Sequence, residues 1–238
     1  MRTALRHWAV IPAAGSGARM GGSVPKQYLP LAGKTVIEHA LNVFLSEPRI
    51  AGISVAIADA DTHWKFISPH IGGKAVRTVK GGEQRAQSVL NILHSLETEL
   101  MRHDWVLVHD AVRPCLRSAD LKHLLEALDQ DEIGGILATP LVDALISMET
   151  SSETNSIPVT GHLWRAFTPQ MFRFGLLVDA LEAAIRRGEN PRDEASAVQN
   201  AGHRVRLVEG RADNIKITRP GDLKMAQAIL DYSADTPP

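Results

Sequence analysis

The sequence predicts an α/β fold: a three-layer sandwich around a mostly parallel, Rossmann-like sheet, with a protruding β-arm. Short apolar stretches alternate with segments of helical periodicity along most of the chain. The predicted strands are apolar throughout, which is typical of parallel sheets covered on both faces. The alternation breaks at residues 141–161, a stretch too long for a structureless loop inside a compact domain, and this favours an exposed arm.

In chain order, the first half predicts strands at residues 8–12, 53–58, 76–79, 105–109 and 135–139, and helices at 35–46, 85–100 and 119–128. Thr35 and Glu38 have the spacing of a capping box. After the arm we expect helices at 174–187, 194–201 and 222–230, and strands at 205–208 and 215–218. We interpret residues 1–238 as a single domain that carries the arm.

Composition excludes several classes of protein. The 238 residues include 26 Lys and Arg against 27 Asp and Glu, a formal charge of −1, and general nucleic-acid or membrane-surface binders carry a basic excess. The only cysteine, Cys115, cannot form an intramolecular disulfide. No window approaches the eighteen or so apolar residues of a membrane helix. We therefore expect a cytoplasmic protein that binds neither nucleic acid nor membrane.

A glycine-rich turn follows the first predicted strand and contains Gly15, Gly17 and Arg19. Small residues let backbone N–H groups approach a polyphosphate, and an arginine adds a charge-assisted contact. An ordinary tight turn is the alternative. Met20 breaks the dinucleotide fingerprint, and Tyr28 stands where a P-loop before Lys34 needs glycine.

Two further segments carry charged residues that could reach the same phosphates. Lys26 lies seven residues beyond Arg19 and could fold back over the same phosphates, although it could equally be a surface lysine. Asp110 ends a buried strand at the ligand edge of the sheet, where Mg²⁺ on a triphosphate would sit. Arg113 could bind a phosphate or pair with Asp110. His109 is interpreted as a packed strand-end histidine.

The segment after the third strand contains Gly82, Glu83, Arg85 and Ser88. Its glycines permit close contact with a flat base, Glu83 and Ser88 could read the base edge, and Arg85 could brace the loop. A plain strand–helix junction is the alternative. Further on, Asp193 is expected to cap a helix, with Ser196 in the first turn.

Lys216 is expected in the middle of a strand among apolar residues, where a lysine needs an anion or a carboxylate partner.

Taken in order, these motifs resemble the 2-C-methyl-D-erythritol 4-phosphate cytidylyltransferase family, over nearly the whole chain. The shared segments are residues 13–21, 25–28, 108–114, 168–170, 193–196 and 212–218. The resemblance implies a nucleotide-diphospho-sugar transferase type of fold, Mg²⁺ as cofactor, and a homodimer whose arm reaches across to the partner. It also implies a reaction of CTP with methylerythritol phosphate that yields diphosphocytidyl-methylerythritol and pyrophosphate, in non-mevalonate isoprenoid biosynthesis.

The resemblance also implies roles for individual residues. Arg19, Lys26 and Lys216 would be the catalytic charges, and Asp110 would lie near the ribose and a metal held mainly by the CTP phosphates. CTP would be held by Ala13, Ala14, Gly15, Gly17, Gly82, Glu83, Ser88 and Asp110. Arg113, Thr168 and Arg192 would lie on the side of the polyol phosphate. Because the substrate phosphate attacks in line, catalysis would rest on positioning and electrostatics.

Three positions depart from the family pattern. Ala144 stands where threonine is usual, Thr160 lies where the returning arm normally has an arginine, and Arg192 replaces a threonine. All three belong to the polyol-phosphate side. We hypothesise that Arg192 supplies the missing arm charge from another wall of the site. The alternatives are a different polyol phosphate, such as ribitol 5-phosphate, or a nucleotide-binding module whose second site has decayed.

Overall fold

The computed structural model describes residues 5–15, 24–67, 74–143, 146–148, 154–156 and 163–235. Within these ranges a seven-stranded sheet has the order β11-β7-β10-β6-β1-β4-β5. Its strands are β1 (His7–Pro12), β4 (Ile50–Ile57), β5 (Ala75–Lys80), β6 (Trp105–Val108), β7 (Gly134–Pro140), β10 (Trp164–Arg173) and β11 (Arg206–Glu209). All pairings are parallel except the two that β10 makes with β6 and β7. The predicted fold class, including the mostly parallel sheet, is therefore confirmed.

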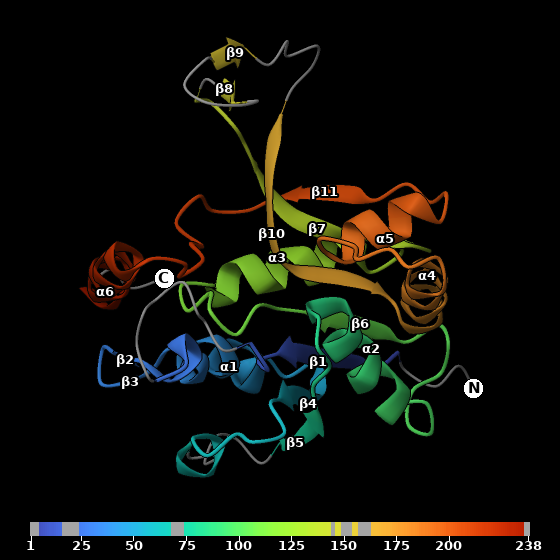
Figure 1. Ribbon diagram of the computed structural model, residues 1–238, viewed down its shortest axis with the longest axis horizontal. Helices are drawn as coiled ribbons and strands as arrows, with labels where there is room; N and C mark the ends of the chain where they lie inside the picture. Colours follow the sequence, from blue (N-terminus) through green and yellow to red (C-terminus); the bar gives the residue numbers. More distant parts are fainter. Residues whose placement is uncertain are drawn as a thin grey trace.

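Two groups of helices cover the two faces of the sheet (Figure 1). On one face α1 (Val36–Ser46) and α3 (Ser118–Leu128) pack into a core that includes Phe44 and Leu124. On the other face α2 (Arg85–Ser95), α4 (Phe174–Arg186) and α5 (Glu194–Asn200) pack around Leu93 and Leu181. These apolar layers bury both surfaces of the sheet, as the continuous apolar strands predict.

A third, smaller core lies beside the first two. The hairpin of β2 (Pro30–Leu31) and β3 (Lys34–Thr35) packs near α6 (Pro220–Asp235), and Ile217 is fully buried between them. Two short 3₁₀ helices, η2 (Lys26–Tyr28) and η3 (Trp64–Phe66), are also present. At the start of α1, Glu38 Oε2 accepts hydrogen bonds from the backbone N–H and the hydroxyl of Thr35, both at 2.7 Å, so the predicted capping box is confirmed.

The arm begins where β7 and β10 leave the sheet. Two short strands, β8 (Ile146–Met148) and β9 (Thr154–Ser156), pair antiparallel beyond the ends of β7 and β10 (Figure 1). Antiparallel pairing is what a chain that leaves and returns produces. The predicted β-arm is thus present, although Ala144 and Thr160 lie outside the described residues.

Several predicted elements differ from the structure, among them the last helix, predicted at 222–230 and observed at Pro220–Asp235. Residues 215–218 are not a strand: they form a loop in which Ile217 N donates to Val112 O at 2.9 Å, without a ladder to either side. The alternation of Ile215 and Ile217 reflects burial in the third core instead of sheet pairing. The second predicted helix ends at Ser95 instead of 100, yet Leu96 and Leu100 are still buried.

Candidate active site

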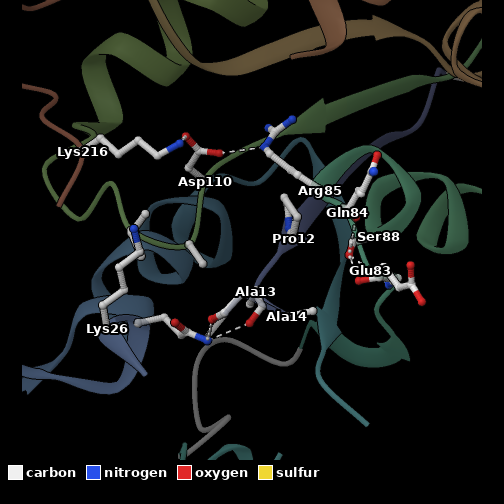
Figure 2. Close-up of a pocket in the computed structure, with 15 residues that line it drawn as sticks. Pro12, Ala13, Ala14, Lys26, Glu83, Gln84, Arg85, Ser88, Asp110 and Lys216 are labelled. Carbon is white, nitrogen blue, oxygen red and sulfur yellow. Dashed lines mark hydrogen bonds and ion pairs between the residues drawn. The ribbon is translucent and has the colours of Figure 1, made fainter. Parts of the chain in front are cut away.

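A pocket of about 210 Å³ opens at the carboxyl edge of the parallel strands, between the ends of β1 and β6 and the start of α2 (Figure 2). Ligands of such sheets bind at this edge, because loops from neighbouring strands converge there. Nine residues predicted for the site line it: Ala13, Ala14, Gly15, Lys26, Gly82, Glu83, Ser88, Asp110 and Lys216. The chain therefore brings together segments that are up to two hundred residues apart in the sequence.

The loop after β1 is clamped by Gln27, a buried side chain that the sequence did not indicate as functional. Gln27 Nε2 donates to Ala13 O at 2.7 Å and to Gly15 O at 3.2 Å. Among the described residues, the N–H groups of Ala14 and Gly15 have no hydrogen-bond partner. A fixed loop with free N–H groups is a suitable site for phosphate oxygens.

The loop between β5 and α2 forms the opposite wall. Ser88 Oγ accepts from Gly82 N at 3.0 Å and donates to Gln84 O, so this buried hydroxyl holds the loop in place. A Cβ at Gly81 would lie only 2.3 Å from Ala14 Cβ. Glycine is therefore required at this position for the two loops to touch.

Asp110, which follows β6, is surrounded by cations. Its Oδ2 lies 2.9 Å from Lys216 Nζ and 3.3 Å from Arg113 Nε, and its Oδ1 accepts from Arg85 Nε at 3.1 Å. Burial by itself would raise the pKa of Asp110. The charges of Arg85, Lys216 and Arg113 outweigh burial and hold that pKa well below its usual range. Asp110 therefore remains a carboxylate at any physiological pH.

Both predicted catalytic lysines meet at the loop of residues 214–218. Lys26 Nζ donates to Ile217 O at 3.1 Å, and Lys216 lies one residue earlier with its ammonium on Asp110. Figure 2 shows the two side chains on the same side of the pocket. Lys216 thus has the carboxylate partner that its apolar sequence context required, although it lies on a loop and not in a strand.

His109 is buried and neutral. Its Nδ1 lies 2.9 Å from Thr168 Oγ1, its Nε2 lies 3.1 Å from Arg113 O, and burial lowers its pKa to about 4. With both ring nitrogens engaged and no contact with the pocket, His109 is not a general base. The prediction of a packed strand-end histidine is confirmed.

Three residues assigned to the polyol-phosphate side do not line this pocket. Thr168 is buried, and its Oγ1 accepts from Asp110 N at 3.0 Å. Arg113 pairs with Asp110 and donates to Asn214 O at 2.8 Å. Arg192 is exposed and has no hydrogen bond or ion pair with the described residues. Their direct contact with substrate stays a prediction, and Gly17 and Arg19 lie outside the described residues.

Arg85 has a larger role in the site than its sequence context predicts. It lines the pocket and joins Asp110 to Glu194, a carboxylate that is only 1% exposed. The sequence predicted only that Arg85 braces its own loop, whereas its guanidinium connects two distant segments. A buried glutamate in the first turn of a helix resembles an ordinary helix-start acid in sequence, so Glu194 gave no separate signal.

Comparisons with known proteins point to one family. The family model for 2-C-methyl-D-erythritol 4-phosphate cytidylyltransferase (IspD) matches residues 7–232. The protein of that name from Hahella chejuensis is 44% identical over 223 residues, covering 94% of this chain and 92% of the relative. The Pseudomonas aeruginosa protein of the same name is 47% identical over 226 residues, covering 94% and 96%.

Solved structures agree. A crystal structure of 4-diphosphocytidyl-2C-methyl-D-erythritol synthase is 38% identical, with a TM-score of 0.82, and covers 96% of this chain and 100% of that one. The Francisella tularensis 2-C-methyl-D-erythritol 4-phosphate cytidylyltransferase is 32% identical with a TM-score of 0.79, covering 94% and 99%. On sequence, fold and length, the chain belongs to the 2-C-methyl-D-erythritol 4-phosphate cytidylyltransferase family.

Proposed function

We propose that the protein transfers the cytidylyl group of CTP to 2-C-methyl-D-erythritol 4-phosphate. A phosphate oxygen of the acceptor attacks the α-phosphorus of CTP, the bond to the β-phosphate oxygen breaks, and pyrophosphate leaves. The observation that carries this proposal is the convergence of Lys26, Lys216 and the N–H groups of Ala14 and Gly15, which have no partner among the described residues, on one pocket. The names of the relatives supply the identity of both substrates.

In this reaction the protein supplies charge and position, since the acceptor is itself the nucleophile. Lys26 and Lys216 would stabilise negative charge that grows on the phosphates in the transition state, and Arg19 would add a third cation. Ala14 and Gly15 would donate N–H groups to the triphosphate. Glu83 and the Gly82 backbone would contact the base from the opposite wall.

Magnesium fits this site as an ion that arrives with CTP. Among the described residues there is no cluster of three or more His, Cys, Asp or Glu side chains arranged to hold a metal. Mg²⁺ is commonly held by one or two carboxylates together with substrate phosphates, and Asp110 is a carboxylate with a lowered pKa in the pocket. When bound, the ion would neutralise phosphate charge. EDTA should abolish turnover, and added Mg²⁺ should restore it.

The test is a substrate panel. Purified protein is mixed with CTP, UTP or ATP and with methylerythritol phosphate or ribitol 5-phosphate, and pyrophosphate release is followed while ³¹P NMR identifies the product. We expect turnover with CTP and methylerythritol phosphate, and Arg19→Ala should lower kcat about 100-fold or more. Preference for ribitol 5-phosphate, or no release above background, would refute the proposal. The family membership of relatives at 44–47% identity does not favour either alternative.

Arg192 is proposed to contact the acceptor phosphate, in place of the arginine that the arm lacks. An Arg–phosphate contact contributes roughly 1.5–3 kcal/mol, so Arg192→Ala should raise KM for the polyol phosphate about 10- to 100-fold, with KM for CTP unchanged. Arg204→Ala, another exposed arginine, is the matched control. An unchanged KM for the polyol phosphate in Arg192→Ala would refute this role.

We also propose a homodimer in the cytoplasm, with the arm contributing to the dimer contact. Within the described ranges, no helix has the length and apolar content to cross a membrane. Light scattering coupled to gel filtration should give twice the 25.9 kDa chain mass. Replacement of the segment between Val142 and Leu163 by a short glycine linker should give the monomer mass. Cell fractionation tests the location.

A further inference from the structure

We propose that Glu194 and Arg85 are positioning residues that set the orientation of the Asp110 carboxylate and, through it, the Lys216 ammonium. The inference rests on the proposed cytidylyl transfer, and it assigns a role to two residues outside the predicted site. It is carried by a chain of contacts through four segments: Glu194 on α5, Arg85 on α2, Asp110 after β6, and Lys216 on the loop before α6.

All three guanidinium nitrogens of Arg85 take part in this chain of contacts. Its Nη1 and Nη2 donate to the two oxygens of Glu194 at 2.6 and 3.1 Å, and its Nε donates to Asp110 Oδ1 at 3.1 Å. The planar guanidinium therefore fixes the direction from which Asp110 Oδ1 is held. Lysine, with a single nitrogen, could not reproduce this geometry.

Glu194 is itself immobilised. Its side chain is 1% exposed, and its neighbours are tied down at the start of α5: Ala195 N donates to Gln170 Oε1 at 2.8 Å, and Ser196 N donates to Asp193 Oδ1 at 2.9 Å. Gln170 lies on β10, so the sheet holds the start of α5 and Glu194 cannot follow movements of Arg85.

The same strand holds the other end of the chain of contacts. Thr168, two residues before Gln170 on β10, accepts the N–H of Asp110. With its backbone fixed, Asp110 retains only the rotation of its carboxylate. Arg85 on Oδ1 sets that rotation together with Arg113, which lies 3.3 Å from Oδ2, and Oδ2 also faces Lys216 at 2.9 Å.

Charge balance shows what the Glu194 carboxylate contributes to this arrangement. Two carboxylates, Asp110 and Glu194, share the positive charge of Arg85, and Glu194 holds the guanidinium fork. In Glu194→Gln the fork would lose its anionic partner and would be drawn to Asp110 or to CTP phosphates. Either change would compete with the contact between Asp110 and Lys216.

The chain offers a matched control at the opposite edge of the sheet. Glu47 is 5% exposed and, like Glu194, is engaged by an arginine: Arg49 Nε and Nη2 lie 2.8 and 3.4 Å from its two oxygens. Glu47 follows α1 and precedes β4, at the amino end of the strands, away from the pocket. Glu47→Gln therefore measures the effect of losing a buried Glu–Arg pair that lies away from the pocket.

The experiment begins with the parent protein, because absence of pyrophosphate release there would refute the proposed function and not this inference. With turnover established, Glu194→Gln should lower kcat about 10- to 100-fold and change KM for CTP less than threefold. Glu47→Gln should leave kcat within twofold. Equal kcat values for the two variants, or a loss confined to KM for CTP, would overturn the inference.

A double-variant comparison separates positioning from general stability. In an Asp110→Asn background, where the carboxylate to be oriented is gone, adding Glu194→Gln should change kcat less than twofold. The same fold-loss in both backgrounds would contradict a role through Asp110. If Glu194→Gln does not fold, as judged by circular dichroism, Arg85→Lys takes its place. Arg85→Lys should show the same loss of kcat, and parental kcat in that variant would overturn the inference.

Discussion

The two edges of the sheet treat buried acids differently. Asp104, Glu47 and Asp110 are 4%, 5% and 6% exposed, so burial alone does not distinguish them. At the amino edge, Asp104 accepts backbone N–H groups of Arg6 and Met101 at 2.9 and 2.8 Å, and Glu47 pairs with the side chain of Arg49, two residues further along the chain. At the carboxyl edge, the Asp110 carboxylate is bonded by the side-chain cations of Arg85, Arg113 and Lys216.

The difference lies in what the partners do. A carboxylate that accepts backbone N–H groups, one from its own turn and one from another segment, holds the two segments together, and its hydrogen bonds are satisfied by the fold itself. A carboxylate held by three cations from distant segments gathers positive charge at a place that a triphosphate can reach. We infer that the charged groups at the carboxyl edge serve to bind a ligand, whereas those at the amino edge stabilise the fold.

The largest effect is expected at Lys216. Lys216→Met removes the ammonium and retains the length of the side chain, so kcat should fall about 10²- to 10³-fold, while Arg85 and Arg113 still hold Asp110 and the protein stays folded. Lys122→Met, on the exposed side of α3, should keep parental activity. Steady-state pyrophosphate release measures both, and a fall of less than tenfold in Lys216→Met would contradict a role at the phosphates.

Gln27 is expected to affect binding more than chemistry. Gln27→Ala loses hydrogen bonds to Ala13 O and Gly15 O, each contributing about 1 kcal/mol, so KM for CTP should rise about 30-fold while kcat changes less. Isothermal titration with CTP checks the affinity directly. Unchanged affinity would show that the β1 loop keeps its shape without the clamp.

His7, at the amino edge, gives a pH dependence of stability. Burial lowers its pKa from 6.5 to about 4. As pH falls below 6.5 the unfolded chain takes up this proton before the folded protein does, so stability is lost as pH decreases. The loss between pH 6.5 and 5 should be about 1.5 kcal/mol from this group. His7→Leu should remove that part of the loss in urea denaturation, and an unchanged pH slope would contradict the assignment.

The smallest effect is expected at Asp131, before β7. Its Oδ1 accepts from Ile133 N at 2.9 Å and Gly134 N at 2.8 Å. Asp131→Ala should lower the free energy of unfolding by about 1 kcal/mol and leave kcat unchanged. Chemical denaturation and the pyrophosphate assay measure the two quantities. A loss of activity without loss of stability would erase the distinction between the edges.

The fold was predictable where the signal is local. Apolar runs and helical periodicity locate β1, β4, β6, α1 and α3 within a residue or two, apart from a later start for β4 in the prediction. The strand β10 was not predicted: Trp164, Arg165 and Pro169 give it no regular alternation, and its antiparallel partners lie more than twenty residues away. A short sequence window cannot show that a segment will pair with strands far away in the chain.

Site residues could be predicted where the residue type and its sequence context indicate a chemical role. Glycines after a strand indicate close approach of a phosphate or a base, and a lysine in an apolar segment indicates an anionic partner; Gly15, Gly82 and Lys216 do line the pocket. Gln27 and Glu194 were not predicted as functional, because an amide clamp and a buried ion pair depend on partners that only the folded chain brings together.

The most direct test compares Asp110→Asn with Asp104→Asn in one assay of kcat, with the free energy of unfolding measured alongside. Both substitutions neutralise an equally buried acid that precedes or follows β6. We predict that Asp110→Asn loses kcat at least 100-fold, whereas Asp104→Asn loses stability and keeps kcat within twofold. Equal effects of the two substitutions on kcat would contradict the inference that buried acids at the carboxyl edge serve catalysis and those at the amino edge serve stability.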